Sequence, residues 1–539
     1  MDAASAPELD GPVTTNHAAF PTRSDATLIP VGVGPLSVDD VVAVAREGAP
    51  VALTPEAIAA IERARGVVDS LAAASRPAYG ISTGFGALAT RHIAPELRAQ
   101  LQRSLVRSHA AGSGPEVERE VVRALMLLRL STLATGHTGV RRPTAELLAG
   151  LLSHGITPVV REYGSLGCSG DLAPLAHCAL ALMGEGEVRD ATGRLMPASQ
   201  ALSAAGLAPV ELEEKEGLAL INGTDGMLGM LALAIVDLRR LLRTLDVAAA
   251  MSVEAQLATD RVFAPELQAL RPHPGQAASA ANLIALLDGS GVVASHRGPD
   301  CNRVQDAYSL RCSPQVHGAA RDTVEYAASV AARELDSAVD NPVVLAEEGR
   351  VESNGNFHGA PVAYVLDFLA IVTADVASIS ERRTDRFLDV ARNHGLPAFL
   401  AHDPGVDSGH MIAQYTQAAI VSDLKRLAVP ASVDSIPSSA MQEDHVSMGW
   451  SAARKLRHGI DGLTRVVAVE ILTAARALDL RSPLQPARAT GAVVRLLRDA
   501  GVPGPGPDRF LSPEIETVVE LVASGAVVET VEAVVGRLR

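Results

Sequence analysis

Aromatic residues are scarce in this chain. Phe, Trp and Tyr make up only 3% of its 539 residues, although 47% of the residues are apolar. The apolar content therefore comes mainly from Ala, Leu and Val, which suit close-packed helices better than an aromatic-rich β-sandwich. The length allows a large core and, by itself, about three to four domains. The composition thus predicts a mainly α protein.

An excess of basic residues is also missing, because Asp and Glu outnumber Lys and Arg by 62 to 47. The net charge of −15 argues against nucleic acid or an anionic membrane as a partner. The cysteines have no C-x-x-C spacing, so we expect neither a zinc site nor a disulfide scaffold. They are compatible with a reducing cytoplasm, where we expect the protein to reside. The four cysteines are Cys168, Cys178, Cys301 and Cys312.

The chain lacks the sequence signals of secretion and of membrane insertion. No basic segment followed by an apolar run stands near residue 1, so we expect no signal peptide. The most apolar later stretch, 362–379, contains Asp367 and Asp375, and carboxylates inside a bilayer are costly. We therefore expect a soluble protein without a membrane partner.

A long stretch without proline dominates the second half. From residue 225 the helical pattern continues for about 35 residues, which corresponds to roughly 50 Å at 1.5 Å per residue. Similar runs follow, a pattern that is typical of a helix bundle. These further runs cover 319–337, 362–386, 409–428 and 446–480. The predicted organisation is a disordered tail (1–28), a smaller mixed region (29–224), a long-helix bundle core (225–485) and a C-terminal helical segment (486–539).

The tripeptide Cys168-Ser169-Gly170 can form an electrophile from its own backbone. If the amide nitrogen of Gly170 attacks the carbonyl carbon of residue 168 and two waters leave, a five-membered ring with an exocyclic methylene results. The methylene carbon comes from Ser169, and glycine suits position 170 because a Cβ would obstruct the approach. The alternative interpretation is a plain Gly/Ser turn that leads into a helix.

The residues after the tripeptide predict the start of a helix. Asp171 can act as its N-cap, and Pro174 is tolerated in a first turn. The positive end of this helix would then face the ring and stabilise electron density pushed onto it.

Six other segments combine turn-forming glycines or polar residues with groups that can bind or react. Each has a structural alternative: a mobile surface turn around residue 79, a structural histidine at 109, or helix capping by Glu443 or Asp444. In the segment around residue 308, an amide, a phenol and a guanidinium suit the binding of an amino acid carboxylate. If that segment is helical, Tyr308 and Arg311 share a face. The segments are Tyr79–Gly86, Arg107–Gly112 with His109, Leu220–Thr224 with Asn222, Gln305–Arg311, Asn354–Gly359 with Phe357, and Ser438–His445 with Glu443.

Together with Gly164–His177, these segments fall in the order and spacing of a known family. From about residue 30 to 485 the chain resembles the histidine and aromatic amino acid ammonia-lyases. Cys168 is a mild departure, because that family more often has Ala there. The pair Ser108-His109 and the segment Gln442–His445 look like the version that acts on histidine. The resemblance therefore implies the elimination of ammonia from L-histidine to give trans-urocanate.

The resemblance also implies a cofactor, an assembly and residue roles. The cofactor would be 4-methylidene-imidazol-5-one (MIO), formed from Cys168-Ser169-Gly170 without a metal. The protein would be a homotetramer whose active sites are built from several chains. The implied roles are Tyr79 as base, Arg311 as carboxylate ligand, Asn222, Gln305 and Tyr308 as orienting groups, Phe357 as pocket wall, and His109 and Glu443 as imidazole ligands.

Three other functions are compatible with parts of the sequence. Gly80–Gly84 matches the G-x-S-x-G pattern of serine hydrolases with Ser82 as nucleophile, but a buried strand should precede it. A polar cluster could hold a metal, although it lacks H-x-x-x-H spacing. Within the family, a lyase or aminomutase could act on tyrosine, phenylalanine or a modified histidine. The polar cluster comprises His394, His402, Asp403, Asp407 and His410.

Overall fold

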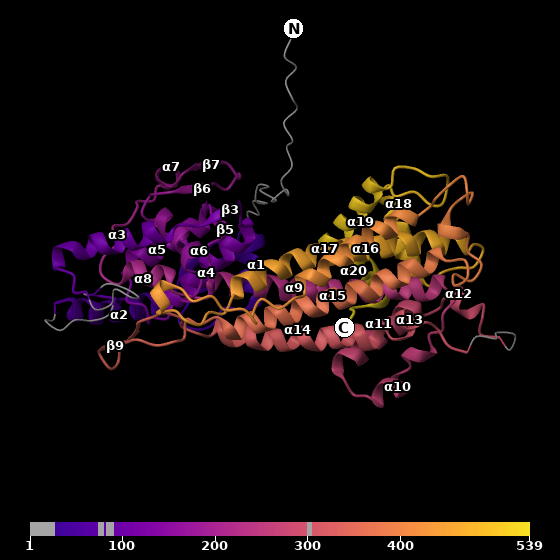
Figure 1. Ribbon diagram of the computed structural model, residues 1–539, viewed down its shortest axis with the longest axis horizontal. Helices are drawn as coiled ribbons and strands as arrows, with labels where there is room; N and C mark the ends of the chain where they lie inside the picture. Colours follow the sequence, from indigo (N-terminus) through magenta and orange to yellow (C-terminus); the bar gives the residue numbers. More distant parts are fainter. Residues whose placement is uncertain (1–26, 74–79, 82, 84–90, 299–303) are drawn as a thin grey trace, which may run out of the picture. The chain divides into compact units, whose positions relative to one another are not determined.

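The computed structural model describes residues 27–73, 80, 81, 83, 91–298 and 304–539. The predicted disordered tail (1–28) therefore lies almost wholly outside the described residues. The described chain is mainly helical, with only short strands, which confirms the predicted fold class (Figure 1).

The chain divides into two compact units, each built from three separate segments. The first unit comprises Met1–Gly229, Glu334–Gly359 and Ser435–Trp450. The second unit comprises Met230–Arg333, Ala360–Asp434 and Ser451–Arg539. These units follow spatial contacts, so the continuous domain boundaries drawn from the sequence stay predictions.

The first unit combines helices with four small sheets. Strands β1 and β2 pair in parallel, and the pairs β3–β5, β4–β6–β7 and β8–β9 are antiparallel. The strands are β1 (Ile29–Val31), β2 (Val51–Leu53), β3 (Ser113–Glu116), β4 (Thr157–Pro158), β5 (Arg161–Tyr163), β6 (Glu187–Arg189), β7 (Leu195–Pro197), β8 (Val343–Leu345) and β9 (Arg350–Glu352). The helices are α1 (Val38–Arg46), α2 (Pro55–Ala73), α3 (Arg98–His109), α4 (Arg119–Ala134), α5 (Arg142–Ser153), α6 (Leu172–Leu182), α7 (Ala198–Ala204) and α8 (Glu216–Ile221), with 3-10 turns at Pro95–Leu97 and Ser439–Met441.

Helix α4 is the buried centre of the first unit. Every residue from Val121 to Leu133 is buried, including two arginines, Arg123 and Arg129. Buried arginines are rare because a guanidinium loses its hydration, so each needs several acceptors. One of them, Arg129, supports the site described below.

The second unit contains the long helices that the sequence predicts. In Figure 1 they run alongside one another. The predicted runs are confirmed within a few residues as α9 (Asp225–Ala255), α14 (Ser313–Leu335), α15 (Ala360–Leu388), α16 (Met411–Leu427) and α17 (Gly449–Leu480). The shorter helices are α10 (Pro265–Ala269), α11 (Pro274–Leu287), α12 (Gly291–Ala294), α13 (Tyr308–Arg311), α18 (Arg488–Asp499), α19 (Ser512–Ser524) and α20 (Ala526–Val535), with 3-10 turns at Arg261–Phe263 and Ala398–Leu400.

A buried carboxylate joins three of the long helices. Glu470 of α17 accepts hydrogen bonds from Arg383 of α15 at 2.5 and 2.8 Å, and both side chains are fully buried. Ser252 of α9 and Ser380 of α15 donate to the same carboxylate at 2.7 and 2.6 Å. Since its oxygens are fully used, the charge is compensated inside an otherwise apolar bundle.

Two helical segments are long and apolar enough to cross a membrane by length and composition alone. They are Glu216–Ala255 and Ala360–Leu388, and 94% and 61% of their most apolar windows are buried inside the protein. Buried core helices of this kind pass the same test, so the segments are weak evidence for membrane insertion.

Replacing the buried carboxylate tests this account of the bundle. Glu470→Gln should lower the free energy of unfolding by about 3–5 kcal/mol, because it leaves the Arg383 guanidinium buried without a counter-charge. The matched control is Glu352→Gln in the exposed pair Arg350–Glu352, which should cost about 1 kcal/mol or less. Urea unfolding followed by circular dichroism measures both, and equal losses would contradict the assigned role.

Candidate active site

The tripeptide lies in a tight loop that a neighbouring main chain closes off. Gly170 has a φ of +78°, which favours glycine. A Cβ at this position would lie 2.1 Å from the carbonyl oxygen of Gly223 and 2.8 Å from its nitrogen. The next residue, Asp171, donates its N–H to the same carbonyl oxygen at 2.7 Å. Two backbones are therefore in direct contact where the ring chemistry requires the closest approach.

Asp171 is the N-cap residue of the helix that follows it, as predicted, but its side chain does not cap that helix. Helix α6 begins at Leu172, and the Leu175 N–H donates to the Asp171 carbonyl at 3.0 Å, without a side-chain hydrogen bond at the cap. The Asp171 carboxylate instead accepts the N–H groups of Gly226 and Met227, both at 2.9 Å, in the first turn of α9. Those N–H groups have no partner within their own helix, which explains the choice. Burial raises the pKa of Asp171 to about 7, although these bonds and one from Ser165 oppose the rise.

A buried arginine, Arg129, stabilises the turn at Asn222 and Gly223. Arg129 of α4 donates to the carbonyl oxygens of Ala219 and Asn222, each at 3.1 Å, and to that of Val339 at 2.8 Å. Its Nε lies 3.4 Å from the Asp225 carboxylate. The guanidinium therefore holds the turn whose next carbonyl, that of Gly223, lies against the tripeptide.

The side chain of Asn222 has one free hydrogen-bonding position. Its amide nitrogen donates to the carbonyl oxygen of Asn341 at 2.8 Å. Its amide oxygen is buried and has no partner among the described residues. A buried acceptor without a partner is costly, so this oxygen is suited to a donor on a bound group.

The segment 435–450 reaches the tripeptide loop from the far end of the sequence. Ser447 donates its hydroxyl to the Gly167 carbonyl at 3.0 Å, and the Met448 N–H donates to the Leu166 carbonyl at 2.9 Å. Helix α17 begins only at Gly449, so neither Glu443 nor Asp444 lies in its first turn. The alternative interpretation of these carboxylates as helix caps is therefore wrong.

Glu443 acts electrostatically on two of the predicted site residues. Burial and, second, the Glu443 carboxylate raise the pKa of Cys168 to about 12. The same carboxylate partly offsets the fall that burial causes in the pKa of His109. Ser438 donates its hydroxyl to Glu443 at 3.1 Å and so orients the carboxylate. The structure thus brings Cys168, His109 and Glu443 together.

The ring of His109 has a defined orientation at the end of α3. Its Nδ1 lies 2.9 Å from the carbonyl oxygen of Leu105, which can only accept a hydrogen bond. This contact assigns the proton to Nδ1, with the Ser108 hydroxyl 3.1 Å from the same nitrogen, and burial favours the neutral ring by lowering the pKa of His109. The lone pair of Nε2 is then available to accept a hydrogen bond.

Phe357 lies in a turn that is tied to the same region. The Asn354 N–H donates to the Asn341 side chain at 2.9 Å, and Asn341 is also the partner of Asn222. The rings of His358 and His445 stack at 5.7 Å between centroids and 8° between planes. Phe357 and Glu443 are therefore carried by two segments that are in contact with each other.

The other three predicted residues belong to the second unit. Gln305 and Tyr308 are exposed, Tyr308 by 72%, and Arg311 is half-buried. The Arg311 guanidinium lies 4.7 Å from the centroid of the Tyr308 ring, which confirms that the two side chains share a face of α13. Arg311 Nε is buried and has no hydrogen-bond partner among the described residues. The guanidinium therefore keeps donor capacity for an anionic group.

Tyr79 and Ser82 lie outside the described residues, so the structure places neither the predicted base nor the alternative nucleophile. The nearest described element before Ser82 is helix α2, which ends at Ala73, rather than a buried strand. In the described ranges, no group of three or more His, Cys, Asp and Glu side chains could hold a metal ion.

Sequence reasoning missed the groups that support the loop. Asp171 was correctly placed at the start of α6, but the partners of its carboxylate in α9 were missed, and Ser447 carried no signal of its own. Arg129 did carry a signal in the sequence, because an arginine inside an apolar helical run must donate to buried acceptors.

The residues present fit an MIO group. A cradle closed by the Gly223 main chain holds the glycine whose nitrogen must approach a carbonyl, and the buried Asn222 oxygen offers an acceptor beside it. Helix α6 starts directly after the tripeptide and directs its positive end toward it.

Comparison with known proteins gives matches over nearly the whole chain. A sequence model of the aromatic amino acid lyase family matches residues 36–499. The histidine ammonia-lyase of Streptomyces avermitilis is 65% identical over 508 residues, which cover 94% of this chain and 99% of that protein. The crystal structure of histidine ammonia-lyase from Trypanosoma cruzi is 38% identical with a TM-score of 0.86, covering 94% of this chain and 95% of the other. The crystal structure of tyrosine aminomutase from Streptomyces globisporus is 37% identical with a TM-score of 0.90, covering 95% and 100%.

A single methyl group tests the backbone contact. Gly170→Ala should prevent ring formation, because its Cβ would overlap the Gly223 carbonyl, and the variant should keep the mass of the unmodified chain. Gly206→Ala is the matched control, since Gly206 also has a positive φ (+69°) but nothing within 4 Å of the added Cβ. Intact mass spectrometry should show the loss of two waters only in the control. A Gly170→Ala protein that also loses two waters would contradict the assigned constraint.

Proposed function

This chain belongs to the aromatic amino acid lyase family, and from that premise we propose that it removes ammonia from L-histidine and releases trans-urocanate. The observation that carries the proposal is the position of Cys168-Ser169-Gly170, pressed against Gly223 and next to Glu443 and His109. An electrophile-forming loop and two groups suited to an imidazole therefore meet in one unit of the chain.

The difficulty of the reaction explains the need for an electrophile. The β-hydrogen of histidine is not acidic, and an amine is a poor leaving group. When formed, an MIO group supplies an electrophilic carbon that makes the amino group easier to expel. The residues of the chain have to bind the substrate, orient it and move the β-proton.

Recognition of the imidazole is the task of His109 and Glu443. Neutral His109 offers the lone pair of Nε2, and Glu443 offers carboxylate oxygens, so both accept hydrogen bonds. An imidazole ring has one N–H when neutral and two when protonated, and these can donate to such acceptors. A phenyl ring has none and would cover both half-buried acceptors without donating a hydrogen bond to them, which costs binding free energy.

The remaining roles follow from the chemistry of the side chains. We assign Arg311 to the substrate carboxylate, because its guanidinium is braced on the Tyr308 ring and keeps an unused Nε. Asn222, Gln305 and Tyr308 would orient the substrate and hydrogen-bond the MIO group, and Phe357 would wall the pocket. Tyr79, in its glycine-rich loop, is the proposed base that removes the β-proton.

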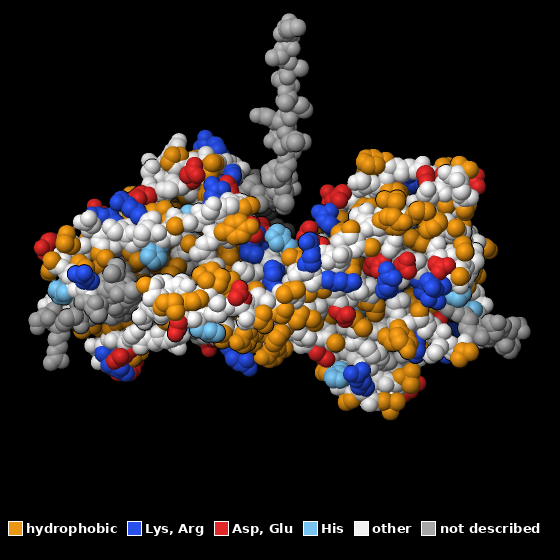
Figure 2. Space-filling view, in the orientation of Figure 1, with side chains coloured by type: hydrophobic (Ala, Val, Ile, Leu, Met, Phe, Trp, Pro, Cys, Tyr) orange, Lys and Arg blue, Asp and Glu red, His pale blue; other side chains and the backbone are white. Residues whose placement is uncertain are grey.

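An assembly of several copies is part of the proposal. Helix α15 exposes Tyr364, Phe368 and Ile371, spaced so that they lie on one helix face, with exposed fractions of 51%, 45% and 45%. Helix α16, which packs on α15, exposes Ile412 and Tyr415. Figure 2 shows patches of apolar side chains on the surface of the second unit. Such surfaces favour contacts with further subunits, in support of a homotetramer with active sites shared between chains.

We also propose a cytoplasmic location. The described cysteines Cys168, Cys178 and Cys312 are free thiols, as expected in a reducing compartment.

A panel of amino acids tests the function. Purified protein mixed with L-histidine should show the rising ultraviolet absorbance of urocanate and release ammonia in equal amount. L-Tyrosine and L-phenylalanine should react far more slowly. A preference for either aromatic substrate, or the appearance of a β-amino acid, would favour the rival tyrosine or phenylalanine lyase or aminomutase activity.

The serine of the tripeptide gives the sharpest variant. Ser169→Ala should abolish urocanate formation, because alanine has no hydroxyl that can leave as water, while the helical circular dichroism signal stays unchanged. Cys168→Ala is the matched control and should remain active, since residue 168 contributes only its carbonyl to the ring. Near wild-type turnover by Ser169→Ala would refute the proposed chemistry.

Loss of the Glu443 carboxylate should impair recognition of the substrate imidazole. Glu443→Gln should lower kcat/KM for L-histidine by about 10- to 100-fold, the effect of losing a hydrogen bond to a charged group worth about 1.5–3 kcal/mol. The adjacent exposed Asp444→Asn serves as control and should change little. Steady-state kinetics measure both, and an unaltered Glu443→Gln enzyme would remove this residue from the site.

A further inference from the structure

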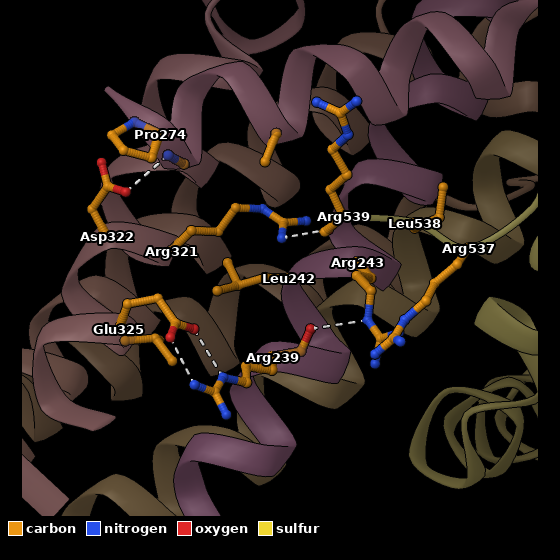
Figure 3. A pocket seen from close by; sticks show the side chains of 13 residues that line it. Arg239, Leu242, Arg243, Pro274, Arg321, Asp322, Glu325, Arg537, Leu538 and Arg539 are labelled. Carbon is orange, nitrogen blue, oxygen red and sulfur yellow. Dashed lines mark hydrogen bonds and ion pairs between the residues drawn. The ribbon is translucent and has the colours of Figure 1, made fainter. Parts of the chain in front are cut away.

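The second unit contains an arginine-lined cavity that none of the predicted site residues lines. Its volume is about 350 Å³, within the range of small-molecule sites. The walls come from α9, α11, α14 and the C-terminal segment 537–539 (Figure 3). Five of its side chains are arginines and two are acidic, in a chain whose net charge is −15. The arginines are Arg239, Arg243, Arg321, Arg537 and Arg539.

Three of these arginines already have carboxylate partners. Glu325 accepts two hydrogen bonds from Arg239, at 2.8 and 2.7 Å. Buried Asp246 pairs with Arg321 at 2.6 Å. These two guanidiniums therefore belong to the structural framework of the cavity, and Arg243 pairs more loosely with Glu532, at 3.2 Å.

The positive charge beyond these pairs is concentrated beside Arg243. Arg243 and Arg537 both line the cavity, and in the view of Figure 3 their side chains extend toward the same end of it. Arg537 is exposed and has no ion-pair partner among the described residues. Glu532 compensates one of these two positive charges, so one positive charge at this end of the cavity has no counter-charge. Guanidiniums bind planar carboxylates and phosphates through two hydrogen bonds.

The segment that carries Arg537 is held in place. The Leu538 N–H donates to Glu532 at 3.0 Å, and the Arg539 N–H donates to the side chain of Asn282 at 2.9 Å. Leu538 is only 5% exposed. The arginine is therefore presented by an ordered wall, and less conformational entropy is lost when it binds a ligand.

The rest of the cavity lining is apolar. Leu242, Ala278, Val324 and Leu538 contribute to it, together with the ring of Pro274. A ligand that fits this lining needs an apolar body attached to its charged group, because bare inorganic ions gain nothing from contact with aliphatic side chains.

We propose that this cavity binds a small organic anion, with a carboxylate or phosphate between Arg243 and Arg537 and an apolar body against Leu242, Val324 and Leu538. The site is separate from the lyase reaction and does not depend on the function proposed above. The carboxylate and phosphate forms share the same recognition, and the experiment distinguishes them.

Isothermal titration calorimetry of the full-length protein at low ionic strength tests the proposal. Phenyl phosphate and phenylacetate are the probes, and inorganic phosphate tests the need for an apolar body. One of the two organic probes should bind saturably, at one site per chain, and at least tenfold more tightly than inorganic phosphate. The tighter of the two identifies the anionic group. Binding of inorganic phosphate as tight as that of phenyl phosphate would overturn the apolar part of the proposal.

Variants separate this cavity from the candidate active site. Arg537→Gln should weaken binding of the probe at least tenfold. The unfolding midpoint should not change, because the Arg537 side chain makes no ion pair among the described residues. Arg311→Gln should bind the probe as the unaltered protein does, which excludes the substrate site as its location. Arg495→Gln, at an exposed arginine on α18, controls for overall charge. The absence of saturable binding, or equal affinity in Arg537→Gln, would refute the site.

Discussion

The contact between the main chains at Gly170 and Gly223 is the constraint on which the candidate site depends. No side chain can stand between them, since even a Cβ would lie 2.1 Å from the Gly223 oxygen. Buried charged groups support both sides of the contact. Arg129 fixes the Asn222–Gly223 turn through three carbonyl bonds, and Asp171 ties the tripeptide loop to the start of α9. Buried polar groups cost free energy, and here they lie where the main chain at Gly170 must be positioned closely for the ring to form.

This arrangement separates two tasks. In the proposed function, the electrophile comes from the backbone, whose position depends on packing, whereas substrate recognition is assigned to side chains on other segments. Glu443 and His109 are positioned by Ser438 and Leu105, neither of which contacts the tripeptide in any interaction described above. On this proposal a change at His109 alters substrate preference while the electrophile is retained, whereas Glu443, which also acts on Cys168, links the two tasks. Such a division suits a family whose solved members include both a histidine ammonia-lyase and a tyrosine aminomutase.

Local patterns in the sequence predicted much of the fold and part of the candidate site. The five long helices follow from proline-free periodic runs, and the tripeptide itself indicated the chemistry. What the sequence could not supply are contacts between distant segments. Asp171 bonds to a residue 55 positions away, Arg129 to one 93 away and Ser447 to one 280 away. A local reading gave Asp171 to the adjacent helix, because N-capping is the commonest use of an aspartate before a helix. Only the fold shows that its carboxylate serves the first turn of α9 instead.

The most direct test of the central claim is the mass of the proteolytic peptide that contains residues 168–170 from the unaltered protein. The account predicts a peptide lighter than its sequence by two water molecules, with the loss confined to these three residues by fragmentation. A peptide of full mass, from a preparation that nevertheless converts L-histidine to urocanate, would contradict the claim that the tripeptide becomes the electrophile.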